Sequence, residues 1–244
     1  MIGLGTLLNF FAIVAGALIG TLLGDRLSTR TRNVVTDALG LVTLLVAGLS
    51  LIDITKPELK EAVGPGMGVL IVLGSLILGG ITGSWWKLED RFENIGKKLK
   101  RSLNRKNKDS NFVEGFVSAS LLFVVGPLAI LGSISDGLGR GIEQLALKSS
   151  LDFFASIAFA ASLGIGVAFS ALAVGVYQGI FTLLGFGLGD VLSEAQVIAL
   201  TVTGGLLLVG VSLRLLKIKQ LPVADLLPAL FYAPILVALV TALK

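Results

Sequence analysis

The chain has 244 residues, a mean hydropathy of +0.91 and a formal net charge of +4, and 15% of its residues are charged, against about 25% in a typical soluble domain. It contains neither cysteine nor histidine. This excludes disulfides, thiolate nucleophiles, zinc sites built from these residues, and haem bound through them. A metal would need oxygen ligands. We expect no cofactor and no enzymatic activity.

Apolar runs of about twenty residues recur along the chain, each long enough to cross a bilayer as a helix. The first run has no basic segment before it, so we expect a retained span rather than a cleaved signal peptide. The sequence therefore predicts an all-α, polytopic membrane helix bundle that forms a single domain, residues 1–244. The predicted spans are 4–24, 34–52, 66–86, 112–133, 149–164, 167–189, 195–214 and 222–243.

The number of spans depends on residues 149–189, an apolar tract too long for one ordinary span. Gly164-Ile165-Gly166 is the best site for a tight turn, which makes the fifth span short. Lys and Arg concentrate in cytoplasmic loops. Eight spans place most of them on one side, with both termini outside the inner (plasma) membrane; seven spans are the alternative. The basic residues left outside are Lys56, Lys60, Arg140, Lys148 and Lys244.

The longest loop, 87–109, predicts a cytoplasmic helix of its own. Its apolar residues recur every three or four positions, as in an amphipathic helix, and its other face becomes strongly basic. We expect it to lie on anionic lipid headgroups, with a regulatory or partner-binding helix as the alternative. Nucleic-acid binding is not expected, because aromatic and basic residues do not alternate on a soluble module. The apolar positions are Trp85, Leu88, Phe92, Ile95, Leu99 and Leu103.

Three glycines, Gly16, Gly20 and Gly24, stand four residues apart in the first span. Glycine weakens a helix in water, but in lipid small residues at this spacing let a second helix approach closely. The stripe predicts a helix contact, either with the sixth span or with a second subunit in a homo-oligomer.

Two pairs of segments resemble each other at a separation of about 160 residues. TLLGD (21–25) resembles TLLGFGLGD (182–190), and LLVAGLSL (44–51) resembles LLLVGVSL (206–213). Because five helices separate the first and sixth spans, a repeat of spans 1–3 and 6–8 would be inverted. Inverted repeats are common in secondary transporters. The alternative is convergence on glycine-rich packing.

Ionisable residues inside spans are costly and therefore suggest function. Four carboxylates lie near span ends, where they could also interact with the helix dipole. Asp152 stands out because it leads directly into FFASIAFAAS. Two amides, Asn9 and Gln178, lie deeper and could line a site or bond between helices. The candidate solute- or ion-binding residues are Asp37, Glu114, Asp152, Asp225, Asn9 and Gln178.

Prolines interrupt two spans. Gly126-Pro127 breaks the fourth, and Pro228 and Pro234 lie in the eighth. Proline frees a backbone carbonyl, which needs a partner inside a membrane. Broken helices often frame transport sites, and ordinary kinks are the alternative. The stretch 126–141 could be partly re-entrant on the outer side.

The segments GTLLNFFAIVAGALIGTLLGDRL, FVEGFVSASLLFVVGPLAILGSISDGL and LDFFASIAFAASLGIGVAFSALAVGVYQG resemble the bacterial YqgA/YdfK-type inner-membrane proteins over nearly the whole chain. The resemblance implies a membrane location and no particular chemistry. LDFFASIAF and VYQGIFTLLGFGLG are also weakly similar to manganese-exporter and lysine-exporter-like transporters. That likeness implies an acid at each of two positions: Asp152 fits the first, but Gln178 replaces the second.

These patterns lead to three functional hypotheses. The first is a secondary transporter or exporter of a small solute or ion, with its site lined by Asp152, Gln178, Asn9 and the break at Gly126-Pro127. The second is a non-transporting membrane scaffold or accessory protein, and the third is a channel. The absence of a Walker A motif favours coupling to an ion gradient over ATP.

Overall fold

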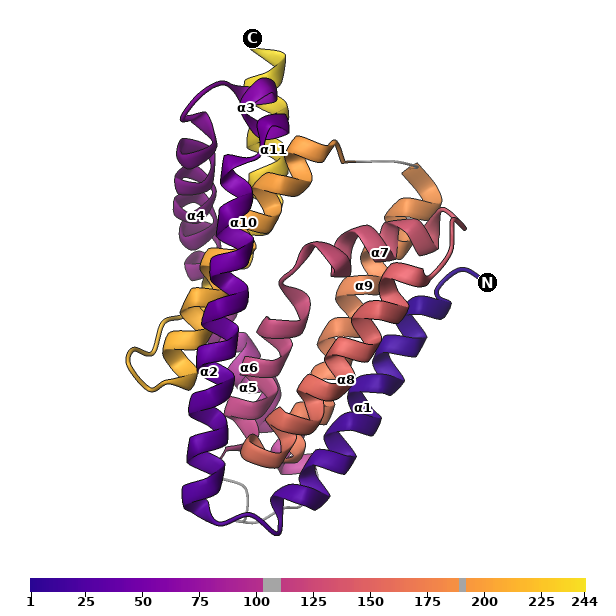
Figure 1. Ribbon diagram of the computed structural model, residues 1–244, viewed down its shortest axis with the longest axis vertical. Coiled ribbons are helices and arrows are strands. Elements are labelled where there is room, and N and C mark those ends of the chain that lie inside the picture. Colours follow the sequence, from indigo (N-terminus) through magenta and orange to yellow (C-terminus); the bar gives the residue numbers. More distant parts are fainter. Residues whose placement is uncertain (103–110, 189–191) are drawn as a thin grey trace. The chain divides into compact units, whose positions relative to one another are not determined.

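The structure is a computed structural model that describes residues 1–102, 111–188 and 192–244, and every regular element in these ranges is helical. The all-α fold is therefore confirmed (Figure 1). The elements are α1 (Leu4–Gly24), α2 (Thr29–Ile52), η1 (Asp53–Thr55), α3 (Pro57–Val63), α4 (Met67–Trp86), α5 (Leu88–Ser102), α6 (Phe112–Val124), α7 (Pro127–Gly137), α8 (Glu143–Leu163), η2 (Ile165–Phe169), α9 (Ser170–Leu188), α10 (Glu194–Leu215), η3 (Val223–Leu226) and α11 (Ala229–Ala242).

Within the described ranges, seven helical segments are long and apolar enough to cross a membrane. An eighth span requires α6 and α7 to count together, and these two helices meet at a bend of 64°. The bend lies at the predicted break, Gly126-Pro127, where Gly126 has φ +149° and proline cannot continue the backbone ladder. The predicted range of seven to eight spans is confirmed.

The fifth span is longer than the sequence predicts. The sequence predicts a short helix over 149–164, but α8 spans 21 residues from Glu143. This prediction is wrong because Lys148 is not a loop residue: it is buried within the helix and paired with Asp152. Asp152 is consequently two turns inside α8 and not in its first turn, so it does not cap the helix dipole.

The chain divides into two compact units. Unit 1 contains α1, α6, α8, η2 and α9, together with residues 29–39 of α2, 92–102 of α5 and 128–137 of α7. Unit 2 contains the rest of α2, η1, α3, α4, the beginning of α5, α10, η3 and α11.

The glycine stripe of α1 lies against α8, and this contact organises unit 1 (Figure 1). A Cβ on Gly16, Gly20 or Gly24 would collide with a backbone carbonyl of α8, belonging to Phe153, Ile157 and Ala161 respectively. Because both sets of numbers rise together, the two helices run parallel. The predicted close packing is thus present, but the partner is the fifth span rather than the sixth span or a second subunit.

Helix α9 lies on another side of α1 and runs in the opposite direction. At one end, the hydroxyls of Thr6 and Thr182 are 3.3 Å apart. Further along, the Phe10 ring approaches Gly175, at 3.4 Å from the position of a Cβ there. Since residue numbers rise along α1 while they fall along α9, the pair is antiparallel.

Unit 2 has an apolar core formed by α3, α4, α10 and α11, in which small residues again allow close contacts. Gly79 and Gly83 of α4 touch the backbone of Ala229 and Asp225, so α4 and the η3–α11 segment are antiparallel. The core residues are Leu59, Val63, Ile71, Val72, Ala195, Ile198, Ala199, Val202, Ala233 and Val237.

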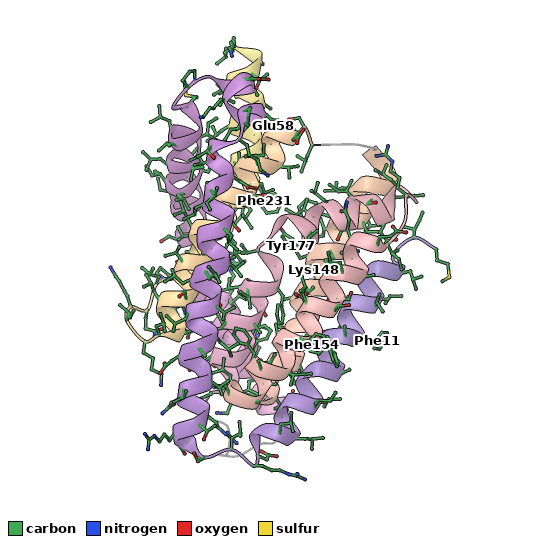
Figure 2. All side chains as sticks on the ribbon, in the orientation of Figure 1. Phe11, Glu58, Lys148, Phe154, Tyr177 and Phe231 are labelled. Atoms are coloured by element: carbon green, nitrogen blue, oxygen red, sulfur yellow. The ribbon has the colours of Figure 1, made fainter. Side chains whose placement is uncertain are left out.

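Large apolar side chains are exposed along the spans. Phe11 and Phe154, labelled in Figure 2, are 64% and 68% exposed, and Leu22 is 70% exposed. Exposure on this scale is unfavourable in water, because each buried aromatic or leucine side chain gains roughly 1.5–3 kcal/mol. In a bilayer these side chains are in a matching solvent, as expected of a membrane protein.

Candidate functional site: a buried polar cluster in unit 1

Helix α8 carries a buried ion pair in its amino-terminal half. The Lys148 ammonium lies 2.8 and 3.1 Å from the two carboxylate oxygens of Asp152. The two residues are only 7% and 6% exposed. Removing both charges from water costs several kcal/mol per ion, which their mutual attraction offsets only in good geometry. A pair in this position therefore needs an explanation beyond general packing.

Helix stability does not explain the pair. Lys148 precedes Asp152 by four residues, and this order is less favourable in a helix than acid before base.

Asn9 connects the pair to α1. Its amide nitrogen donates to the Asp152 Oδ2 atom at 2.9 Å, so the carboxylate receives hydrogen bonds from two helices. Asn9 is fully buried, on the same side of α1 as the glycine stripe. Its side-chain oxygen has no hydrogen-bond partner within the described part of the chain.

Gln178 lies at the same level of unit 1 as Asn9. The contacts Thr6–Thr182 and Phe10–Gly175 bracket both amides along the antiparallel pair α1 and α9. Residues three and four apart share a helix face, so Gln178 is on the side of α9 that faces α1. It is fully buried, and neither its oxygen nor its nitrogen has a hydrogen-bond partner among the described residues.

We call Asn9, Lys148, Asp152 and Gln178 the polar cluster. Buried amides are normally satisfied, because an unsatisfied polar group costs about 1–3 kcal/mol. Lys148 is labelled on α8 in Figure 2. The hydroxyl of Tyr177 on α9 is also buried and unpartnered in the described structure. Further unpartnered buried hydroxyls of unit 1 belong to Ser118, Ser120 and Ser156.

Helices α6 and α7 meet α8 on either side of the ion pair. Phe123 of α6 stacks edge-on against Phe159, and Gly132 of α7 approaches Leu145. Lys148 and Asp152 lie between these two contacts along α8. Residues 125–127, which contain the predicted break Gly126-Pro127, group with unit 2.

The remaining predicted site residues lie elsewhere. Glu114 is in the first turn of α6, where its negative charge interacts favourably with the helix dipole. Asp37 is exposed on α2. Asp225 belongs to unit 2 and accepts a hydrogen bond from the backbone nitrogen of Glu89 at 2.9 Å, at the start of α5. The structure thus brings Asn9, Asp152 and Gln178 to one level and leaves these three carboxylates outside the cluster.

Sequence reasoning missed two buried charged residues. One is Lys148, which the four-residue spacing from Asp152 could have revealed had the helix been extended backwards. The other is Asp136, whose two carboxylate oxygens accept from the backbone nitrogens of Gly3 and Gly5 at 3.1 and 3.0 Å. Asp136 of α7 therefore satisfies donors at the beginning of α1, and no local sequence signal links the two segments.

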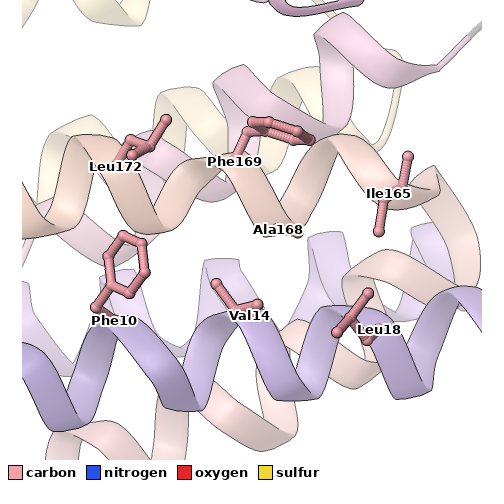
Figure 3. Close-up of a pocket in the computed structure, with 7 residues that line it drawn as sticks. All are labelled: Phe10, Val14, Leu18, Ile165, Ala168, Phe169 and Leu172. Carbon is pink, nitrogen blue, oxygen red and sulfur yellow. The ribbon is translucent and has the colours of Figure 1, made fainter. Parts of the chain in front are cut away.

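An apolar groove of about 350 Å³ runs along the seam of α1 with η2 and α9 (Figure 3). Phe10, one of its lining residues, directly follows Asn9, yet none of the four cluster residues lines the groove. In this conformation the polar cluster is occluded from the groove. The lining residues are Phe10, Val14, Leu18, Ile165, Ala168, Phe169 and Leu172.

Comparison with known proteins supports the membrane class. Residues 4–238 match the family described as "Protein of unknown function (DUF554)". An "Uncharacterized membrane protein YdfK" of Bacillus subtilis (strain 168) is 28% identical over 238 residues, 98% of this chain and 97% of the relative. An "Uncharacterized protein YqgA" of Escherichia coli (strain K12) is 31% identical over 242 residues, 98% of each chain. No solved structure matches significantly.

Proposed function

Because the chain belongs to the DUF554 family, whose description states no activity, we propose a function from its own interior: it is a secondary transporter or exporter of a small solute or ion, with the polar cluster as its binding site. The observation that carries this proposal is the buried Lys148–Asp152 pair bonded to Asn9, whose side-chain oxygen is unused, at the level of the buried and unpartnered Gln178 in the described structure. A charged side chain inside a membrane costs free energy, and such residues commonly lie on substrate or ion pathways.

The pairing of helices supports an inverted repeat, which we include in the proposal. In unit 1 the first and sixth spans, α1 and α9, are antiparallel. In unit 2 the second and seventh spans, α2 and α10, are also antiparallel, since the Gly40 carbonyl accepts a hydrogen bond from Ser212 and Ser50 touches Gly205. The third and eighth spans, α4 and the η3–α11 segment, are antiparallel as well. A twofold axis in the membrane plane would produce such pairs, and transporter sites lie near such axes.

We propose that the described state, in which the cluster is buried, is one state of a transport cycle. A bound solute must reach the cluster, so the seam between α1 and α9 has to open on at least one side. Phe10 against Gly175 closes this seam next to Asn9. We therefore assign the occluded form to the intermediate of an alternating-access cycle, in which the site is closed to both sides.

Transport by the purified protein in liposomes tests the proposal directly. A panel of inorganic ions, organic acids, amines and amino acids should include at least one solute whose flux depends on the protein. Asp152→Asn and Gln178→Ala should each reduce that flux at least tenfold. The matched controls, Asp90→Asn and Gln144→Ala, change exposed residues and should leave it intact. A folded protein without flux for any member would favour the accessory-protein hypothesis.

We also propose that α5 rests on anionic lipid at the cytoplasmic face of the plasma membrane. Trp85 is 80% exposed just before the helix, and Lys97, Lys98 and Arg101 are exposed on it. Leu103 and the remaining residues to 109 lie outside the described residues. Phosphatidylglycerol should stabilise the protein more than phosphatidylcholine does, and Lys98→Glu with Arg101→Glu should remove most of that difference.

A further inference from the structure

The polar cluster combines one positive and one negative charge in the interior of unit 1. Lys148 and Asp152 cancel each other, and the other buried carboxylate of the described unit 1, Asp136, is already bonded to Gly3 and Gly5. A solute of net charge would bring an uncompensated charge into this low-dielectric interior, at high cost. A solute without net charge avoids that cost.

The cluster also has unused hydrogen-bonding capacity of both signs. The Lys148 ammonium has three donors, and its hydrogen bonds within the described residues go to one carboxylate. The Asn9 oxygen is an unused acceptor, and Gln178 offers one acceptor oxygen and two donor hydrogens, all unpartnered in the described structure. A bound anionic group can therefore be met at Lys148, and a cationic group at Asp152 and the Asn9 oxygen.

Other classes of solute fit less well. A divalent cation requires several oxygen ligands, usually including more than one carboxylate. Throughout the described ranges, no three acidic side chains are grouped as a metal would need. A simple anion would be repelled by Asp152, and a simple organic cation by Lys148, unless the ion pair first separated.

We propose that the solute recognised by the polar cluster is a small zwitterion, which carries one ammonium and one carboxylate group. Its two charges insert between Lys148 and Asp152 and exchange one ion pair for two. No covalent bond changes. This inference rests on the proposed transport function and narrows it to a substrate class.

Three probes that differ by one group test the charge requirement. Alanine carries both groups, propionate lacks the ammonium, and ethylammonium lacks the carboxylate. We expect the protein in liposomes to take up alanine at least tenfold faster than either analogue, and alanine alone to raise the unfolding temperature of the detergent-solubilised protein. β-Alanine and glycine betaine extend the zwitterion set, and glycerol serves as an uncharged polar probe.

Variants separate recognition from folding. Lys148→Met with Asp152→Leu removes both charges together, so it should fold and yet lose the response to alanine. Gln178→Ala should weaken the response, whereas Gln144→Ala on the exposed side of α8 should not. Equal or stronger flux of propionate, ethylammonium or glycerol would overturn the zwitterion inference and leave transport standing. Protein-dependent flux of none of the probes or of the wider panel would overturn both. An alanine response that survives in the double variant would exclude the cluster as its site.

Discussion

Lys148 and Asp152 each depend on the other to neutralise a buried charge. Removing one of them leaves the other charged, buried and unpaired, which typically costs about 3–5 kcal/mol of stability, whereas replacing both with apolar residues is often neutral. We therefore expect Lys148→Met alone to lower the free energy of unfolding by about 3–5 kcal/mol. Lys148→Met with Asp152→Leu should recover most of that loss.

Unfolding in mild detergent, followed by circular dichroism, measures these differences. Lys97→Met on the exposed face of α5 is the matched control, because its ion pair with Glu93 is solvent-exposed. Surface ion pairs contribute about 0–1 kcal/mol. Equal losses in the single and the double variant would show that the pair does not act as a buried unit.

Asp136 acts at the same scale through backbone donors. It accepts from Gly3 and Gly5 and is 2% exposed. Because these nitrogens belong to the start of α1 and have no helical partners, Asp136→Ala should cost about 1–2 kcal/mol, as loss of a helix cap does. Hydrogen exchange at the amino end of α1 should rise selectively. Unchanged protection there would contradict the capping role, and Asp53→Ala in η1 provides a control away from α1.

At the scale of the element, the contact between α1 and α8 depends on the absence of side chains. A Cβ on Gly20 would overlap the carbonyl of Ile157, so the two backbones must separate if a side chain is added. Gly20→Leu should therefore destabilise the protein by about 1–3 kcal/mol or more, as overpacking does. Gly48→Leu on α2 is the matched control, because nothing lies within 4 Å of a Cβ there.

The midpoints of unfolding of Gly20→Leu and Gly48→Leu, measured in the same detergent, show which substitution lowers stability more. Gly48→Leu should remain close to the parent protein, since its side chain would point into open space on an exposed position. A Gly20→Leu variant as stable as Gly48→Leu would mean that the stripe is not a packing contact in solution.

At the scale of the whole molecule, the parallel course of α1 and α8 bears on the number of spans. If both cross the membrane, the segments between them must cross it an odd number of times. Helices α2 and α4 supply two crossings, so the bent pair of α6 and α7 has to supply the third. The parallel course of α1 and α8 therefore favours eight spans over seven, and eight spans would place both termini on the same side.

The natural lack of cysteine allows a direct test of this topology. Single cysteines at Ile2, Lys98 and Lys244 can be labelled in intact cells with a membrane-impermeant maleimide. Eight spans and the positive-inside rule predict labelling at Ile2 and Lys244, and at Lys98 only after the membrane is opened. Labelling of the two ends from opposite sides would show an odd number of crossings.

Much of the fold could be predicted because it depends on local patterns. The apolar runs locate the spans, the run of basic residues marks α5, and Gly126-Pro127 marks the bend between α6 and α7. Of the candidate site, Asn9, Asp152 and Gln178 could be singled out as polar groups in apolar surroundings. Lys148 could not be recognised as a member, because a charged residue at the edge of an apolar run looks like a loop residue until its partner is known.

By itself, the sequence determined the membrane class, the helical architecture and the small-residue stripe of α1, since each follows from composition or from spacing along one helix. Only the tertiary structure decided that the stripe meets α8, that Asp136 caps α1, and that Gln178 shares a level with Asn9. The physical reason is that membrane helices are apolar on nearly every side. Hydrophobic periodicity then no longer identifies the buried face, and which helices meet is decided by close packing and by the pairing of a few polar groups.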